Sequence, residues 1–141
     1  MLALYEPDIP QNCGTMLRAC ACLGVDAAII EPAGFPVSDR HFRRAGMDYL
    51  DQVRIDRHAS FAAFEAWRAG QGRRLVLLST AGDTAVWDFA FQPGDILMVG
   101  RESAGAPAHV HERADARLIV PLRAGLRALN VAVAASGALG E

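Results

Sequence analysis

Five short apolar runs recur along the chain, and they constrain its fold more than any other feature. Each run has three or four residues and is bounded by polar or turn-forming residues, a pattern typical of strands buried on both faces of a sheet. Segments with helical periodicity lie between most of them. We therefore predict an α/β fold, a parallel sheet flanked by helices on both faces. The runs are Leu2–Tyr5, Ala27–Ile30, Leu75–Leu78, Ile96–Val99 and residues 118–120.

Turn and capping residues predict where the other elements begin and end. Two prolines within residues 6–12 argue against regular structure there, and Asn12 is a good N-cap for a helix over residues 13–23. Gly24 is placed to end that helix. The remaining expectations are a short helix over residues 38–45, a strand over residues 53–55, a helix capped by Ser60 that runs through Ala69, and an irregular connection over residues 83–94.

The composition indicates one compact domain over residues 1–141. Hydrophobic residues make up 52% of the chain and charged residues 21%, which excludes a disordered protein. No apolar run approaches the roughly 20 residues of a membrane span, and no basic region followed by an apolar stretch opens the sequence. We therefore expect a cytoplasmic protein with no membrane partner.

Three cysteines, Cys13, Cys20 and Cys22, lie within ten residues of one another. Residues two apart on a helix point to different faces, so Cys20 and Cys22 are not expected to share a metal ion or a disulfide. We predict free thiols in a reducing compartment and no metal site, with a redox or metal role as the less favoured alternative.

A glycine turn follows the run Ile96–Val99. Gly100 and Gly105 can adopt a positive φ and let a ligand approach the main chain, and Pro107 suits the first turn of a short helix. The spacing imitates a phosphate-binding P-loop, but that loop requires a lysine, and all 14 basic residues are arginine. Ligands of open α/β sheets bind at the carboxyl ends of the strands, so this turn suits a small polar cofactor. An ordinary turn is the alternative.

The densest basic cluster in the chain is Arg40-His41-Phe42-Arg43-Arg44. The net charge of −2 gives no overall attraction to nucleic acid. A guanidinium fork nevertheless suits phosphate oxygens, so an RNA-facing patch is one interpretation. A solvated helix face is the other.

Four motifs occur in order and with matched spacing, and together they resemble the SPOUT superfamily of methyltransferases. They are Glu6-Pro7-x-Ile9-Pro10-x-Asn12-x-Gly14-x3-Arg18, Arg43-Arg44-Ala45-Gly46-x-Asp48-Tyr49, Gly100-x-Glu102-x2-Gly105-x-Pro107 and Arg127-x-Leu129-Asn130. The best match is the branch that 2′-O-methylates the wobble nucleotide of tRNA. The resemblance implies a C-terminal deep trefoil knot, an exception to the rule against knots. It also implies S-adenosylmethionine as cofactor, tRNA as substrate and a homodimer.

The resemblance assigns roles to individual residues. Arg18 would reach the cofactor site of the partner subunit, hold a substrate phosphate and stabilise charge on the 2′-oxygen. Asn130 would hold the loop or the cofactor. The structural alternatives are a salt bridge from Arg18 to Glu6 or Asp8, and a helix cap at Asn130. The expected cofactor-binding residues are Leu78, Gly100, Glu102, Gly105, Val120, Ala128 and Asn130, and the expected RNA-binding residues are Arg40, Arg43, Arg44 and Arg127.

Departures from the family pattern keep two other functions open. Ala128 stands where the family usually has Ser, Arg101 stands where Pro is common, and residues 131–141 predict only a short helix broken by glycines where the family has a long one. The alternatives to an enzyme are an RNA-binding protein of the same fold without catalysis, and a cofactor-sensing dimer without an RNA partner. The sequence does not distinguish cytidine from uridine as the modified nucleotide.

Overall fold

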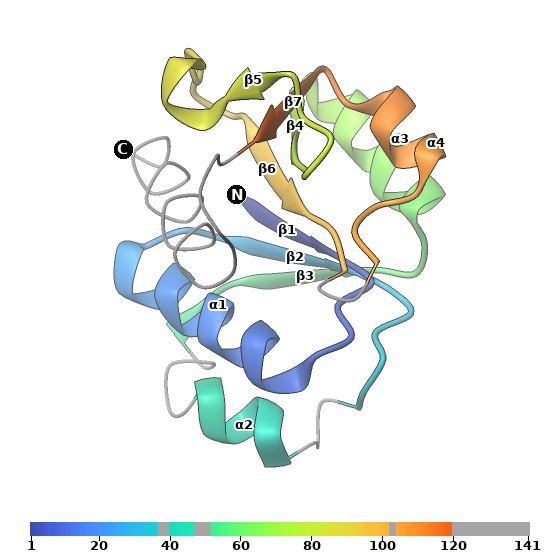
Figure 1. The fold of residues 1–141 in the computed structure, drawn as a ribbon. Helices are drawn as coiled ribbons and strands as arrows, with labels where there is room; N and C mark the ends of the chain where they lie inside the picture. The colour runs from blue at the N-terminus through green and yellow to red at the C-terminus, as the bar shows by residue number, and fades with distance from the viewer. Residues whose placement is uncertain (37–39, 47–51, 102–103, 120–141) are drawn as a thin grey trace.

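The computed structural model describes residues 1–36, 40–46, 52–101 and 104–119. Within this part, seven parallel strands form one sheet in the order β3-β2-β1-β6-β4-β7-β5 (Figure 1). The predicted parallel α/β fold is therefore confirmed. The strands are β1 (Leu2–Tyr5), β2 (Ala27–Ile30), β3 (Ile55–His58), β4 (Leu75–Leu78), β5 (Thr84–Ala85), β6 (Ile96–Val99) and β7 (Ala116–Ile119). The helices are α1 (Pro10–Leu23), α2 (Arg40–Gly46), α3 (Phe61–Gln71), α4 (Ala108–Arg113) and the short 3₁₀ helix η2 (Val86–Asp88).

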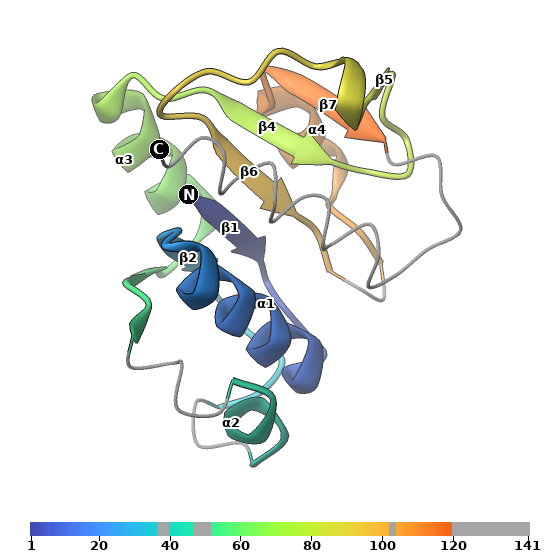
Figure 2. The ribbon, with the colours of Figure 1, turned by 90° about the vertical axis from the view of Figure 1, so that its left-hand side faces the viewer.

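Alternate residues of the central strands face opposite sides of the sheet, and helices cover both sides. Leu2 and Leu4 of β1 belong to a hydrophobic cluster with side chains of α1 and with Phe42 of α2. Ala3 and Tyr5 belong to a second cluster with side chains of α3 and α4. Figures 1 and 2 show α1 and α2 side by side, apart from α3 and α4. This double burial explains why the strand runs are apolar throughout rather than alternating.

The start of α1 differs from the prediction. Its N-cap is Ile9, and Pro10 occupies the first helical turn, so Asn12 lies inside the helix rather than at its cap. Proline suits this position because its φ is already helical and its missing N–H would have no partner in the first turn. The predicted end is confirmed, since Gly24 caps the helix in the left-handed conformation with φ 69°.

Other boundaries also differ. The strand expected over residues 53–55 begins at Ile55, because the register of β3 against β2 pairs Ile55 with Ala27. The Ser60 cap is confirmed, but α3 continues through Gly70 and ends where Gly72 takes φ 64°. The connection over residues 83–94 was expected to be irregular but contains β5 and η2, and two residues are too few for a strand pattern. The helix expected over residues 38–45 is described as α2 from Arg40 to Gly46, and its predicted start at residues 38 and 39 lies outside the described part. β7 begins at Ala116.

Residues 120–141 lie outside the described part of the chain. The predicted knot, the turn at residues 127–130 and the expected site residues Val120, Arg127, Ala128 and Asn130 fall there, and Glu102 falls in a second undescribed segment. Among the helices that the structure describes, none is both long enough and apolar enough to cross a membrane.

Candidate functional site

The parallel strands bring the expected cofactor-binding loops to one edge of the sheet. Leu78, the last residue of β4, lies opposite Val99 of β6 on one side and Leu118 of β7 on the other. The glycine turn begins at the next residue after Val99, so Leu78 and Gly100 are neighbours, as the sequence predicts. Leu78 is half-buried and packs against the core cluster on the α1 side of the sheet.

The glycine turn closes on its own backbone. The amide of Arg101 donates to the Gly105 carbonyl at 3.2 Å, and the amide of Gly105 donates to the Arg101 carbonyl at 2.7 Å. Gly105 has φ 67°, and among the described residues no atom lies within 4 Å of the place where a Cβ would lie. The prediction of a positive φ is therefore confirmed for Gly105, which leaves open space beside its main chain.

The prediction of a positive φ is wrong for Gly100. Among the described glycines, Gly100 does not have a positive φ. Glycine is needed there for a different reason. A Cβ at Gly100 would lie 2.6 Å from both the Ala106 nitrogen and the Gly105 carbonyl carbon. The two sides of the turn thus approach too closely for any side chain at Gly100.

The loop after β4 packs against the backbone of β7. The Ser79 amide donates to the Leu118 carbonyl at 2.8 Å. A Cβ at Gly82 would lie 2.7 Å from the Ile119 nitrogen, so only glycine fits this approach. The Ser79 hydroxyl lies 3.4 Å from Nε2 of His111 on α4. Ser79, Gly82 and His111 were not predicted as site residues, although the turn at Gly82 was a signal available in the sequence.

An ion pair joins the glycine turn to the end of β1. The Arg101 guanidinium contacts the carboxylate of Glu6, which is mostly buried and has φ 40°. Glu6 therefore pairs with Arg101, in contrast to the alternative that paired it with Arg18.

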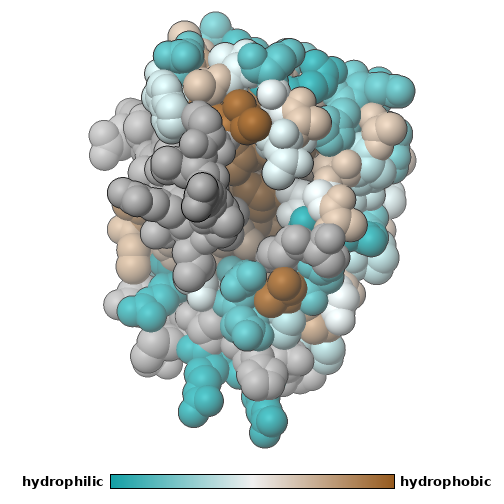
Figure 3. All heavy atoms as spheres, in the orientation of Figure 1, coloured by the Kyte–Doolittle hydropathy of each residue, from teal (hydrophilic) through white to brown (hydrophobic). Residues whose placement is uncertain are grey.

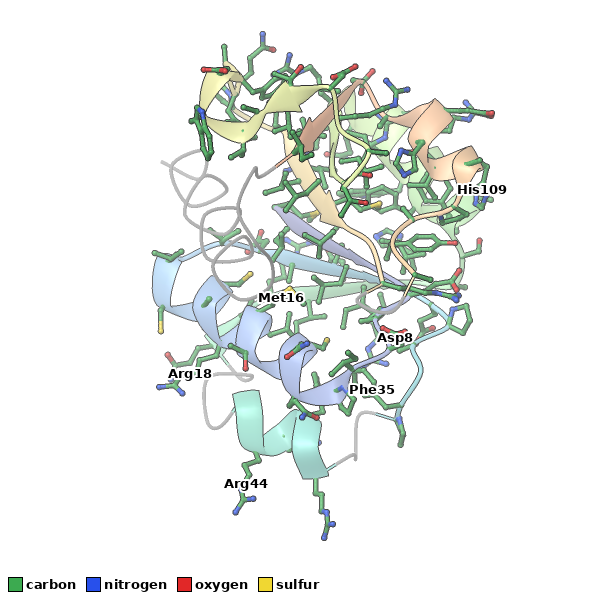
Figure 4. All side chains as sticks on the ribbon, in the orientation of Figure 1. Asp8, Met16, Arg18, Phe35, Arg44 and His109 are labelled. Atoms are coloured by element: carbon green, nitrogen blue, oxygen red, sulfur yellow. The ribbon has the colours of Figure 1, made fainter. Side chains whose placement is uncertain are left out.

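Arg18 lies on the exposed face of α1 (Figure 4). Met16, two residues earlier, is buried against the sheet. The Arg18 side chain points outward and lies well away from Asp8 in Figure 4. Arg18 is thus exposed in the single chain, and its catalytic role stays a prediction.

The basic cluster occupies α2 at one end of the molecule. Arg40, Arg43 and Arg44 are exposed, whereas Phe42 is buried against α1. Figure 3 shows hydrophilic side chains projecting at the end where Figure 4 places Arg44. These guanidinium groups can reach an anionic partner without any change in the fold, and RNA binding by them stays a prediction.

The thiols agree with the sequence analysis. Cys13 and Cys20 are buried, Cys22 is exposed, and all three are free. Burial raises the pKa of the Cys20 thiol to about 12. Within the described residues, no group of three His, Cys, Asp or Glu side chains is arranged to hold a metal ion.

The described residues form a parallel α/β sheet, and the loops at the carboxyl ends of β4 and β6 are built largely from backbone contacts and small residues. The chain belongs to the SpoU rRNA Methylase family, whose model matches residues 1–139. This confirms the SPOUT resemblance seen in the four motifs.

Individual relatives agree with the family. The tRNA (cytidine(34)-2'-O)-methyltransferase of Beijerinckia indica is 72% identical over 141 residues, which is 100% of this chain and 88% of that protein. A solved structure described as "Structural insights into the 2-OH methylation of C/U34 on tRNA" has 35% identity and a TM-score of 0.88, over 98% of this chain and 93% of that one. The SpoU methyltransferase AviRb from Streptomyces viridochromogenes, solved in complex with the cofactor AdoMet, shares the fold with a TM-score of 0.85 and 21% identity, over 97% of this chain and 56% of that one.

Proposed function

We propose that the protein transfers a methyl group from S-adenosylmethionine to the ribose 2′-oxygen of the wobble nucleotide of tRNA. The observation that carries this proposal is the similarity, over the whole of this chain, to a relative named tRNA (cytidine(34)-2'-O)-methyltransferase. The structural likeness to the protein studied for methylation of C/U34 supports it. Cytidine is the nucleotide that the relative's name favours. Such a substrate implies a cytoplasmic enzyme.

The loops at the carboxyl ends of β4 and β6 fit the proposed cofactor. The half-buried Leu78 offers an apolar surface beside the turn, and the space next to Gly105 lets a ligand approach the backbone. We propose that Leu78, Gly100 and Gly105 form one side of this pocket. The remaining expected contacts, Glu102, Val120, Ala128 and Asn130, would complete it, with the C-terminal part of the chain in the knot of the SPOUT superfamily.

The bound cofactor would supply an electrophilic methyl group. The protein must hold the ribose 2′-oxygen in line with that group, and positioning of this kind can lower a barrier by several kcal/mol. An arginine side chain cannot serve as the base, because a pKa above about 12 keeps the guanidinium group protonated. We assign Arg18 to the substrate phosphate and to the negative charge that develops on the 2′-oxygen.

The position of Arg18 supports a site shared between two subunits. Its side chain leaves α1 on the face opposite Met16, away from the sheet and from the glycine turn of its own chain. An arginine in this position is available to a substrate that is held by a second chain. We therefore propose a homodimer in which Arg18 of each subunit serves the site of the other.

A methylation assay tests the proposed function. Unmodified total tRNA is incubated with labelled S-adenosylmethionine, and the labelled nucleotide is identified after digestion. We expect one 2′-O-methylated nucleotide at the wobble position. Binding of tRNA without transfer would support the RNA-binding alternative, and binding of the cofactor without binding of tRNA would support the sensing dimer.

A further inference from the structure

A cavity opens at the carboxyl ends of β2 and β3, apart from the glycine turn. Its volume is about 540 Å³, within the range of small-molecule sites. Apolar side chains form much of its wall and charged groups form its rim. The lining residues that matter here are Glu31, Pro32, Phe35, Pro36, Phe42 and Arg57.

The apolar wall suits a flat ring. Phe35 is half-buried, and its ring centroid lies 5.2 Å from that of the buried Phe42, with 40° between the ring planes. Pro32 and Pro36 are exposed beside them. Figure 4 places Phe35 between the sheet and α2. Aromatic faces of this kind stack on nucleobases whatever the base, because every base has a π face.

The rim supplies both donors and acceptors. Arg57 Nη1 lies 3.3 Å from Glu31 Oε1, and the two side chains are 44% and 40% exposed. An ion pair this exposed contributes little to stability, so its groups can turn to a ligand without unfolding the protein. The guanidinium can donate to ring nitrogens and carbonyls of a base, and the carboxylate can accept from an exocyclic amine.

The charges in and around the cavity determine which part of a nucleotide can enter it. The Glu31 carboxylate disfavours a phosphate inside the cavity. The exposed guanidinium groups of Arg40, Arg43 and Arg44 lie on the same helix as Phe42, outside the cavity, where phosphates of a connected strand would find them. The cavity therefore matches a base, and its surroundings match the backbone that carries the base.

The distance between the cavity and the glycine turn agrees with a substrate that reaches from one to the other. β2 and β3 lie two and three positions from β6 in the sheet, which corresponds to roughly 10–14 Å at the usual strand spacing. The cavity and the glycine turn both lie at the carboxyl edge of the sheet. A few unstacked nucleotides cover such a distance.

We propose that this cavity binds an unpaired nucleobase of the RNA substrate other than the base of the methylated nucleotide. The base stacks on Phe35, and Arg57 and Glu31 contact its edge. This inference rests on the proposed function, since it takes the substrate to be an RNA with unpaired bases next to the target.

A double-mutant cycle tests it. Binding of an anticodon stem-loop RNA is measured for the wild type, for Phe35→Leu and for Phe91→Leu. The cycle uses the intact RNA and a set of altered RNAs. In each altered RNA, one unpaired nucleotide other than the target is replaced by an abasic one. Phe91 is a matched control, because it is also half-buried and its ring centroid lies 4.9 Å from that of Phe89. We expect Phe35→Leu to weaken binding of the intact RNA roughly 5- to 100-fold, and Phe91→Leu to bind like the wild type.

The decisive result is coupling. One abasic position should weaken binding by the wild type and cause no further loss in Phe35→Leu. Unchanged affinity of Phe35→Leu, or equal losses for every abasic RNA in both proteins, overturns the proposal. If Phe35→Leu fails to fold, as its melting curve and cofactor affinity would show, Arg57→Gln takes its place in the cycle with the same criteria. RNA that binds but is not methylated refutes the proposed function and leaves this cycle to decide the cavity, and RNA that does not bind refutes both.

Discussion

The proposed role of Arg18 can be tested directly by substitution. Its side chain lies on the outer face of α1 and is exposed. We expect Arg18→Ala to leave the melting temperature nearly unchanged, since exposed substitutions shift stability by about 0.5 kcal/mol or less. Methyl transfer should fall on the order of 100-fold or more, as for loss of one transition-state donor. Single-turnover rates and melting curves on one preparation measure both.

Arg113→Ala is the matched control, since Arg113 is an exposed arginine on α4. It should keep the wild-type rate. A destabilised Arg18→Ala with normal turnover per folded molecule would make Arg18 structural.

Cys20 couples stability to alkaline pH. Its folded-state pKa is raised to about 12 from an ordinary 9.0, so above pH 9 the unfolded chain loses a proton that the folded chain retains. Stability is thus complete below pH 9 and falls as pH rises towards 12, by about 1.4 kcal/mol per pH unit for one group. Denaturant unfolding between pH 8 and about pH 11 should show a steeper fall for the wild type than for Cys20→Ala. Equal slopes would contradict burial of this thiol. Cys22→Ala, at an exposed position, should keep the wild-type slope.

The glycine turn is the element on which cofactor binding depends. Gly100→Ala places a methyl group 2.6 Å from the Ala106 nitrogen, so the turn must open. We expect cofactor affinity to fall at least tenfold, since the loop geometry beside Gly105 changes with it. Isothermal titration calorimetry with S-adenosylmethionine measures this.

Gly70→Ala serves as the control, because no atom of the described residues outside the backbone of α3 lies within 4 Å of its Cβ position. It should leave cofactor affinity unchanged and stabilise the helix by about 0.5–1 kcal/mol. Wild-type cofactor affinity in Gly100→Ala would exclude this turn from the pocket.

Elements with a strong local signal were predictable from the sequence, and those defined by a neighbour were not. β1, β2, β4 and β6 have the predicted bounds because burial on both faces demands unbroken apolar runs. β5 has two residues and exists through its pairing with β7. At the site, the convergence of Leu78 and Gly100 followed from parallel order. The close approach at Gly82 was not predictable, since it depends on the backbone of β7, distant in sequence.

At the scale of the whole molecule, the outward direction of Arg18 leads to a prediction about assembly. We expect light scattering at micromolar concentration to give twice the 15.1 kDa mass of one chain, because a shared site needs two subunits. Mixing Arg18→Ala with a cofactor-site variant such as Gly100→Ala provides a second measurement. Mixed dimers should recover part of the activity, since one of their two sites keeps both intact components. A monomer that is fully active would refute the shared site.

The two neighbours of β1 become available at very different times. Leu2 lies opposite Ala27 of β2 on one side and opposite Leu97 of β6 on the other. During synthesis at about 5–20 residues per second, β6 follows β2 by roughly 3–14 s. Through that interval one edge of β1 has no strand to pair with, and unpaired edges of apolar strands promote association between chains. The early half of the chain therefore emerges from the ribosome with a strand edge that only the late half can cover. Slow translation between β2 and β6 lengthens the time during which this edge can promote aggregation.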